Sequence, residues 1–202
     1  MHPYSTDSKE RKFIPLILSV ISIGFAWILN KLLLNDWLNL SSLWWIEAPS
    51  VIGFYSILYT FFNNKLWKYR FFQKMGLIKI PNLNGVWSGG IISSFDEHSK
   101  KTEATLEIIQ SWSQFRINLS TLCSKSKSIT GVILTNEPDK IEICYQYINE
   151  PKSHAISTMH THRGTANLIY YPKDQDIKGE YFSGRDRQNY GRLTFSKEAN
   201  ND

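Results

Sequence analysis

The stretch KIEICYQYI (residues 140–148) decides the fold of the larger part of this chain. Its large apolar and aromatic residues fall at every second position, and smaller or polar residues fill the positions between them. Successive side chains of a β-strand point to opposite faces, so this pattern indicates a strand with one buried face. EATLEI (residues 103–108) alternates in the same way. From Pro81 onward no long helical period interrupts such patterns.

Working outward from this stretch, we predict eight sequential strands separated by short turn-like pieces such as NEPD and PKDQD. They cover residues 85–95, 103–112, 114–124, 128–136, 140–148, 161–171, 177–183 and 190–196. Eight short-looped strands favour an all-β, antiparallel up-and-down barrel, which leaves no sheet edge exposed. A β-sandwich is the alternative. The interior of such a barrel admits side chains or one small ligand.

The N-terminal third has a different character. Residues 13–29 carry no charge, and together with Leu32, Leu33 and Leu34 they are long enough to cross a hydrocarbon core of about 30 Å. A second run, residues 43–62, has one acidic residue near its start. We therefore predict an α-helical hairpin with two transmembrane spans over residues 13–63. A signal peptide is less consistent with the length of the first run, and buried helices of a soluble protein are the other alternative.

The charges around these runs predict the orientation of the chain. Lysines and arginines precede the first run and follow the second, whereas Lys31 is the only one between them. By the positive-inside bias, both termini are expected in the cytoplasm. The predicted order is a cytoplasmic tail (residues 1–12), the hairpin, a basic juxtamembrane linker (residues 64–80) and a cytoplasmic barrel (residues 81–198).

The net charge of +5 does not indicate binding to a nucleic-acid polymer. The excess of basic residues lies entirely in residues 1–79, and residues 80–202 contain equal numbers of basic and acidic residues. The predicted barrel thus has no basic field that could follow a long polyanion. Any anion site in the barrel must be a local arrangement of a few side chains.

Motifs of common enzyme families do not occur in the sequence. There is no Gly-x-Ser-x-Gly elbow, no phosphate loop and no HExxH helix. His160 and His162 lie two positions apart and could share one face of a strand, but no third metal ligand accompanies them. We expect neither a catalytic site nor a metal or cofactor.

A candidate ligand site is the last predicted hairpin, GEYFSGRDRQNYGRLTF (residues 179–195). Arg185 and Arg187 flank its tip, and Tyr181 and Tyr190 lie on either side. A bidentate guanidinium and an aromatic plane together can hold a phosphate and a base. A solvated, charge-mixed turn is the alternative interpretation.

Two further stretches contribute candidates. Arg163 and Thr165 lie within THRGTANL (residues 161–168), where an arginine in a strand needs a partner. Trp87, in NLNGVWSGG, is either a core residue or a stacking wall of a pocket.

Together these features resemble one family. Two N-terminal spanning segments, then LNGVWSG, HRGTANL and the closing GEYFSGRDRQNYGRLTF are similar to the membrane effectors of bacterial CBASS anti-phage operons, which accompany cGAS-like nucleotidyltransferases. The resemblance implies a barrel at the inner membrane that binds a cyclic dinucleotide. It also implies homo-oligomerisation and disruption of the bilayer, which arrests growth.

On this basis we predict the roles of eight residues. Arginine would pair with phosphate, the aromatic residues would stack on bases or line the pocket, and the remaining two would donate or accept hydrogen bonds; the set is Arg163, Arg185, Arg187, Trp87, Tyr181, Tyr190, His162 and Thr165. Two alternatives remain: a membrane-anchored, lipocalin-like carrier of a lipid or hydrophobic metabolite, and a docking subunit of a larger membrane complex.

Overall fold

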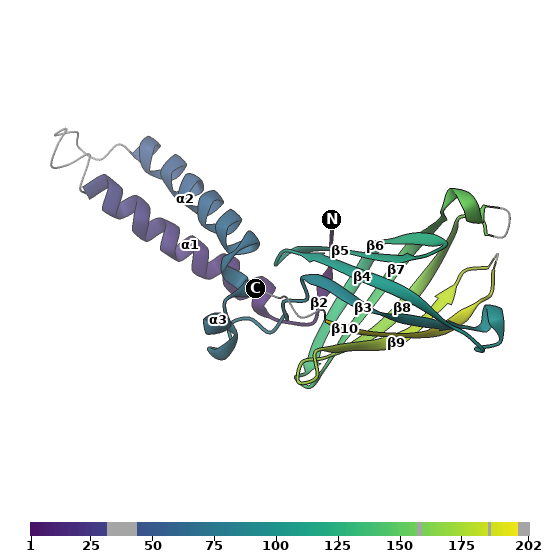
Figure 1. Ribbon diagram of the computed structural model, residues 1–202. Coiled ribbons are helices and arrows are strands. Elements are labelled where there is room, and N and C mark those ends of the chain that lie inside the picture. The colour runs from purple at the N-terminus through teal and green to yellow at the C-terminus, as the bar shows by residue number, and fades with distance from the viewer. Residues whose placement is uncertain (32–43, 157–158, 186, 198–202) are drawn as a thin grey trace. The chain divides into compact units, whose positions relative to one another are not determined.

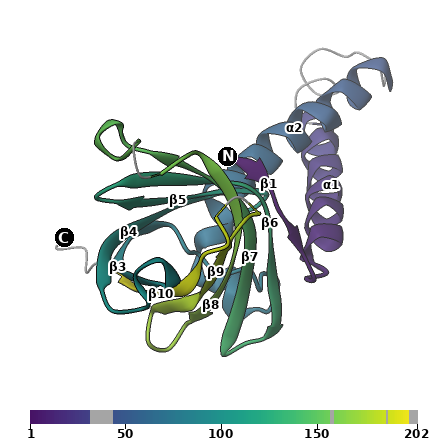
Figure 2. The ribbon, with the colours of Figure 1, turned by 90° about the vertical axis from the view of Figure 1, so that its right-hand side faces the viewer.

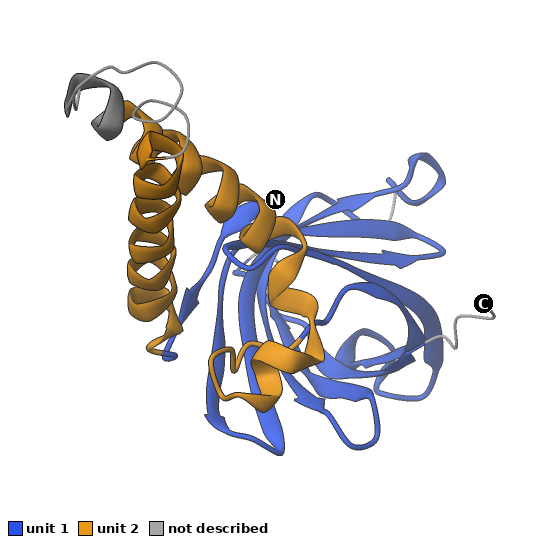
Figure 3. Cartoon of the chain, turned by 90° about the vertical axis from the view of Figure 1, so that its left-hand side faces the viewer, with its two compact units in different colours: residues 1–8, 82–202 blue, residues 9–81 orange. Residues whose placement is uncertain are grey.

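A computed structural model describes residues 1–31, 44–156, 159–185 and 187–197 of the chain. The chain divides into two compact units (Figure 3). Residues 1–8 and 82–202 form the barrel unit, and residues 9–81 form the helical unit. The first eight residues therefore belong to the barrel, although a long stretch of sequence separates them from the rest of it.

The barrel unit contains the eight predicted strands. They are β3 (Gly85–Ser93), β4 (Lys101–Gln110), β5 (Gln114–Thr121), β6 (Ser124–Glu137), β7 (Lys140–Pro151), β8 (His162–Tyr171), β9 (Asp176–Ser183) and β10 (Tyr190–Lys197). Each strand pairs antiparallel with the next, β10 pairs with β3, and β5 pairs with β6, so the sheet closes on itself (Figures 1 and 2). The up-and-down barrel is confirmed and the sandwich alternative is wrong.

The alternation that predicted the strands also describes their burial. Along β4, Ala104, Leu106 and Ile108 are buried and the residues between them are exposed. Along β7, Ile141, Ile143, Tyr145 and Tyr147 are buried, and the residues between them are exposed or, at Cys144, half-buried. Burial of one face of every strand supplies the main driving force for closing the barrel.

One end of the barrel is filled by large side chains. The indole N–H of Trp87 donates to the Leu83 carbonyl oxygen at 3.1 Å, and its ring meets Tyr170 edge-on with ring centroids 5.7 Å apart. Other fully buried residues include Leu106, Trp112, Phe115, Ile117, Ile133, Ile143, Leu168 and Phe195. This end, from which β3 begins and at which β10 ends, is a hydrophobic plug.

Two short strands at the N-terminus extend the sheet. β1 (His2–Pro3) pairs antiparallel with β5, and β2 (Ser5–Thr6) pairs parallel with β6. The sequence analysis placed residues 1–12 in a tail and did not predict these pairings.

The helical unit contains α1 (Glu10–Leu29), α2 (Trp44–Asn64), a 3-10 turn (Leu66–Lys68) and α3 (Arg70–Lys74). α1 and α2 lie side by side (Figure 1), and α1 buries one stripe of residues at four-residue spacing: Ile14, Leu18, Ser22 and Ala26. The Glu10 carboxylate accepts the Lys79 backbone N–H at 2.6 Å.

Among the described residues, α1 is the one helix whose length and apolar composition suit a membrane span. A second helix, α2, covers the second apolar run, but a hairpin of two spans stays a prediction. Leu32, Leu33 and Leu34, the end of the first predicted span, lie outside the described residues.

Candidate functional site

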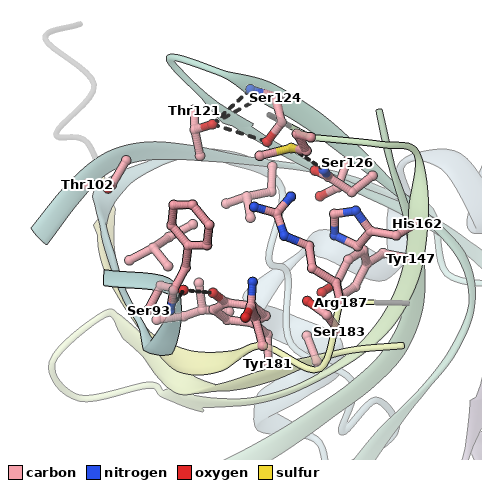
Figure 4. Close-up of a pocket in the computed structure, with 18 of the residues that line it drawn as sticks. Ser93, Thr102, Thr121, Ser124, Ser126, Tyr147, His162, Tyr181, Ser183 and Arg187 are labelled. Carbon is pink, nitrogen blue, oxygen red and sulfur yellow. Dashed lines mark hydrogen bonds between the residues drawn. The ribbon is translucent and has the colours of Figure 1, made fainter. Parts of the chain in front are cut away.

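The end of the barrel opposite the plug contains a cavity of about 280 Å³ (Figure 4). Its walls come from the last residues of β3, β5, β7 and β9, the first residues of β4, β6 and β8, and the loops between them. Polar lining residues include Ser93, Thr102, Thr121, Ser124, Ser126, Asn149, Ser183 and Asn189. Apolar residues such as Ile91, Leu119, Ala166 and Leu193 lie deeper along the same strands. The cavity is therefore a cup with polar walls near its mouth.

Two tyrosine side chains of the cavity wall pack against glycines of the neighbouring strands. A Cβ on Gly191 would lie 2.6 Å from the Tyr181 ring, so only glycine leaves room for that ring. The Tyr181 hydroxyl then donates to the Ser93 side-chain oxygen at 2.7 Å. A Cβ on Gly164 would overlap the Tyr147 ring in the same way. These glycines allow bulky side chains to fold flat against the barrel wall.

Burial keeps these phenols protonated. It raises the pKa of Tyr147 to about 12, although a hydrogen bond with Ser183 and the positive charge of Arg187 partly oppose the shift. Burial also raises the pKa values of Tyr145 and Tyr181 above the ordinary value. At neutral pH all three are uncharged hydroxyls that can donate a hydrogen bond.

Arg187 is the principal cation of the cavity. It lies in the turn between β9 and β10, where its backbone N–H donates to the Gly184 carbonyl oxygen at 3.0 Å. Its guanidinium carbon is 5.1 Å from the centroid of the Phe95 ring. The Asn189 side-chain oxygen faces the turn and accepts a hydrogen bond from Arg187 Nε–H at 3.0 Å. Figure 4 shows the side chain extending among the labelled cavity residues.

One part of this guanidinium is left unsatisfied. Arg187 Nη1 is buried and has no hydrogen-bond partner among the residues that the structure describes. An unpaired, buried, charged donor is costly, so such a group indicates a place where an acceptor binds. Asp96 Oδ1, in the loop between β3 and β4, is likewise buried without a partner within the described parts of the chain.

Three of the eight predicted site residues line the cavity: His162, Tyr181 and Arg187. His162 Nδ1 lies 2.9 Å from the His160 carbonyl oxygen. Arg185 and Tyr190 are exposed beside the same hairpin, and the Tyr190 ring is 5.5 Å from that of His98. These two residues are near the cavity in sequence but do not line it.

The remaining three predicted residues are not brought into the cavity. Because side chains alternate along β8, the inward position of His162 places Arg163 and Thr165 on the exposed outer face. Trp87 is fully buried in the plug, which agrees with the core interpretation and not with a pocket wall. His162, Arg163 and Thr165 were all predicted to contact the ligand, but the two-residue period of the strand places His162 on one face and the other two on the opposite face.

Other cavity residues were missed by the sequence analysis. The run SKSKS (residues 124–128) alternates buried serine with exposed lysine, so its inward face is polar. The alternation of apolar residues predicts a strand that starts at residue 128, whereas β6 starts at Ser124. A search for small hydroxyl residues at alternate positions would have found this part of the cavity.

The arrangement of side chains in the cup suits a small anion. A guanidinium faces hydroxyls and aromatic rings, a combination suited to a phosphate and a base. In the described residues, no group of three or more His, Cys, Asp and Glu side chains is placed to hold a metal ion. Both cysteines are free thiols, Cys123 at the cavity and Cys144 on β7.

The fold and the site together are a closed eight-stranded barrel with a cup of hydroxyls, aromatic rings and one guanidinium at one end. The chain belongs to the family described as Cap15, cyclic dinucleotide receptor domain, whose sequence profile matches residues 78–197. It is also 29% identical over 201 residues to CD-NTase-associated protein 15 of Yersinia aleksiciae, covering 94% of this chain and 91% of that protein. The resemblance to CBASS effectors is thereby confirmed.

Proposed function

We propose that cyclic dinucleotide binding in the cup makes this CBASS effector self-associate and disrupt the inner membrane. The family implies the cyclic dinucleotide and the link to a CD-NTase. The observation that carries the assignment of the site is the buried, unpartnered Nη1 of Arg187. A phosphate oxygen would complete its hydrogen bonding and neutralise its charge at the same time.

The other cavity groups have distinct roles in this proposal. Tyr147 and Tyr181 provide aromatic surfaces for a base and neutral hydroxyls for phosphate or ribose oxygens. His162 and the serines of β6 complete the hydrogen-bonding wall. Asp96 accepts a hydrogen bond from an exocyclic amino group of a base, which contributes to the choice of nucleotide. No contact is assigned to Trp87, Arg163 or Thr165.

The size of the cavity indicates how the ligand is accommodated. At about 280 Å³, the cavity is slightly smaller than the roughly 300–1,000 Å³ that ligand sites usually enclose. A cyclic dinucleotide contains two complete nucleotides and needs more space. In the proposal one nucleotide enters the cup and the other lies at the mouth, near Phe95, Arg185 and Tyr190, of which Phe95 is 67% and Tyr190 53% exposed.

The helical unit is the effector part. α1 spans the inner membrane, α2 forms the second span, and both termini and the barrel are cytoplasmic. The outward face of α1 is rich in exposed large apolar residues, as contact with lipid requires: Phe13, Leu16, Val20, Ile23, Trp27 and others. Ligand-driven association collects several hairpins, and their assembly opens the bilayer without any chemical reaction.

The lipid-carrier alternative has less support. A purely apolar ligand would leave Arg187 Nη1 buried and without a hydrogen-bond partner among the described residues. Hydroxyls of the cavity such as those of Thr102 and Ser126 also offer hydrogen bonds that a fatty acid chain would not use.

The test is a titration of the full chain, in detergent micelles, with cyclic di-AMP, cyclic di-GMP, cyclic UMP-AMP and oleate. We expect at least one cyclic dinucleotide to bind and oleate to show no saturable binding. The same protein in dye-loaded vesicles should release dye only with the bound nucleotide. Saturable binding of oleate alone would replace the receptor by a carrier, and binding without dye release would remove the membrane-disrupting step.

A further inference from the structure

The first eight residues, here called the N-terminal strap, fill a gap in the barrel wall. Direct pairing between β5 and β6 is limited to Asn118–Ser120 and Lys125–Lys127, the shortest ladder of the barrel. Below it, β1 bonds to β5 and β2 bonds to β6. The strap therefore bridges two strands that are not paired with each other at that level.

Side chains hold the strap firmly in this gap. The buried Tyr4 donates its hydroxyl hydrogen to the Trp112 carbonyl oxygen at 2.7 Å, and its ring packs 5.1 Å from that of Phe115. The Asp7 carboxylate accepts the Thr135 backbone N–H at 2.8 Å and its hydroxyl at 3.0 Å. Contacts of this kind, made on both strands, indicate a fitted element of the barrel.

The strap and the ligand cavity share the same two strands. Leu119 of β5 and Ser126 of β6 line the cavity. Two residues along each strand, on the same face, Ser128 Oγ accepts the Ile117 backbone N–H at 2.9 Å and lies 2.8 Å from His2 Nε2. The seam between β5 and β6 is thus a cavity wall at one end and a seat for the strap at the other.

This geometry links occupancy of the cavity to the strap. For such a link, the cup must widen when a cyclic dinucleotide seats one nucleotide inside it and the other at its mouth. Only three residue pairs join β5 to β6, fewer than between any other neighbouring barrel strands, so we expect this ladder to separate first. Separation of β5 from β6 moves apart the two strands to which the strap is bonded, so bonds on one side must break. In the chain, the strap is followed directly by α1, the predicted membrane span.

We propose that the N-terminal strap is an autoinhibitory latch, which holds the β5–β6 seam closed in the ligand-free receptor and is released when a cyclic dinucleotide binds. This inference rests on the proposed function. Release frees the segment that leads into α1 and so turns a change in the cavity into a change at the membrane helix. Because coupling between two sites is reciprocal, a weaker latch also makes ligand binding tighter.

The first experiment weakens the latch in the full chain. Asp7→Ala removes the bonds to Thr135, Tyr4→Phe removes one hydroxyl bond, and Ser5→Ala, at an exposed position of the strap, is the matched control. We expect Asp7→Ala to arrest growth in cells without a CD-NTase and to bind the cyclic dinucleotide that binds wild type best about fivefold more tightly or better. Tyr4→Phe should shift both readouts less, and Ser5→Ala should match wild type.

The second experiment locks the latch. Pro3 and Gln114 are exposed register partners, and antiparallel partners have the Cα spacing that a disulfide needs. Pro3→Cys/Gln114→Cys should, when oxidised in vesicles, weaken binding at least about fivefold and stop dye release, and a reductant should restore both. Ile109→Cys/Arg116→Cys, which bridges β4 and β5 outside the seam, is the control and should behave like wild type.

Each outcome decides the matter. The proposal is overturned if Asp7→Ala neither arrests growth nor changes ligand affinity. It is also overturned if the oxidised Pro3→Cys/Gln114→Cys variant binds ligand and releases dye as wild type does. Loss of binding together with a lower melting temperature in Asp7→Ala shows a purely structural strap and also overturns it. If wild type binds no cyclic dinucleotide, the proposed function fails. Growth arrest by Asp7→Ala in cells without a CD-NTase then still tests whether the strap is inhibitory.

Discussion

Replacing Arg187 by alanine gives the sharpest test of the site. Arg187 and Arg185 lie two residues apart in the same turn, but Arg187 lines the cavity and Arg185 is exposed. Removal of a charge-assisted pair with phosphate costs about 1.5–3 kcal/mol. That corresponds to roughly a ten- to hundredfold loss of cyclic dinucleotide affinity. For Arg185→Ala, a surface change, we expect an effect within about 0.5 kcal/mol.

The assay is isothermal titration of the full chain in micelles, with a thermal melt of each variant. Arg187→Lys should restore only part of the affinity, because an ammonium lacks the bidentate fork of a guanidinium. Loss of the contact with Phe95 should lower the melting temperature only slightly, since such pairs contribute about 0.5–1 kcal/mol at exposed sites.

Two results would refute the assignment of Arg187. The first is unchanged affinity in Arg187→Ala. The second is an equal loss in Arg185→Ala, which would mean that the turn contributes a diffuse positive charge and not one directed contact.

Three further predictions follow from the same structure. Trp87→Phe should destabilise the barrel by about 1–3 kcal/mol in a denaturant titration, because a buried hydrogen bond and volume are lost, yet leave ligand affinity within about threefold; a selective loss of affinity would make Trp87 a site residue. The pKa of Tyr147 is raised to about 12 from an ordinary value of about 10, so the folded state holds the phenol proton more tightly than the unfolded state does. The stability that results is complete below pH 10 and is lost as the pH rises toward 12. The melting temperature should therefore fall between pH 10 and pH 12, and it should fall less in Tyr147→Phe. A reporter fused to the C-terminus should be active only in the cytoplasm, and periplasmic alkaline phosphatase activity from that fusion would contradict the topology.

Much of the barrel could be predicted because its strands obey one local rule. Alternating burial along β4 and β7 fixes which face is inside, and short turns leave little choice of topology. The rule weakens where the inside of the barrel is polar, and for this reason residues 125–127 of β6 fall between two predicted strands. It gives no signal for the N-terminal strap, whose two-residue strands exist only because β5 and β6 leave a gap for them.

The site was harder to predict for a different reason. Successive side chains of β8 point to opposite faces, so His162 faces the cavity and Arg163 does not. The same two-residue period that predicted the strands is sufficient to predict this difference. The choice between Arg185 and Arg187 depends on the turn, where no period applies. Gln188 has a positive φ of 51°, and such a turn conformation, which sets the direction of its neighbours, is not encoded in a simple pattern.

An effector that arrests growth must be almost wholly inactive without its ligand and almost wholly active with it. Moving a two-state equilibrium from about 1:99 to 99:1 requires roughly 5.5 kcal/mol of differential ligand affinity. In the proposed site, a phosphate pair with Arg187 would contribute about 1.5–3 kcal/mol and stacking of one base on a cavity tyrosine about 1–3 kcal/mol, provided that both contacts form in the active state alone. Together these terms reach the required value only when both are near their upper limits. Loss of Arg187 should therefore abolish growth arrest while weak binding persists, and self-association must sharpen the response that a single barrel can barely produce.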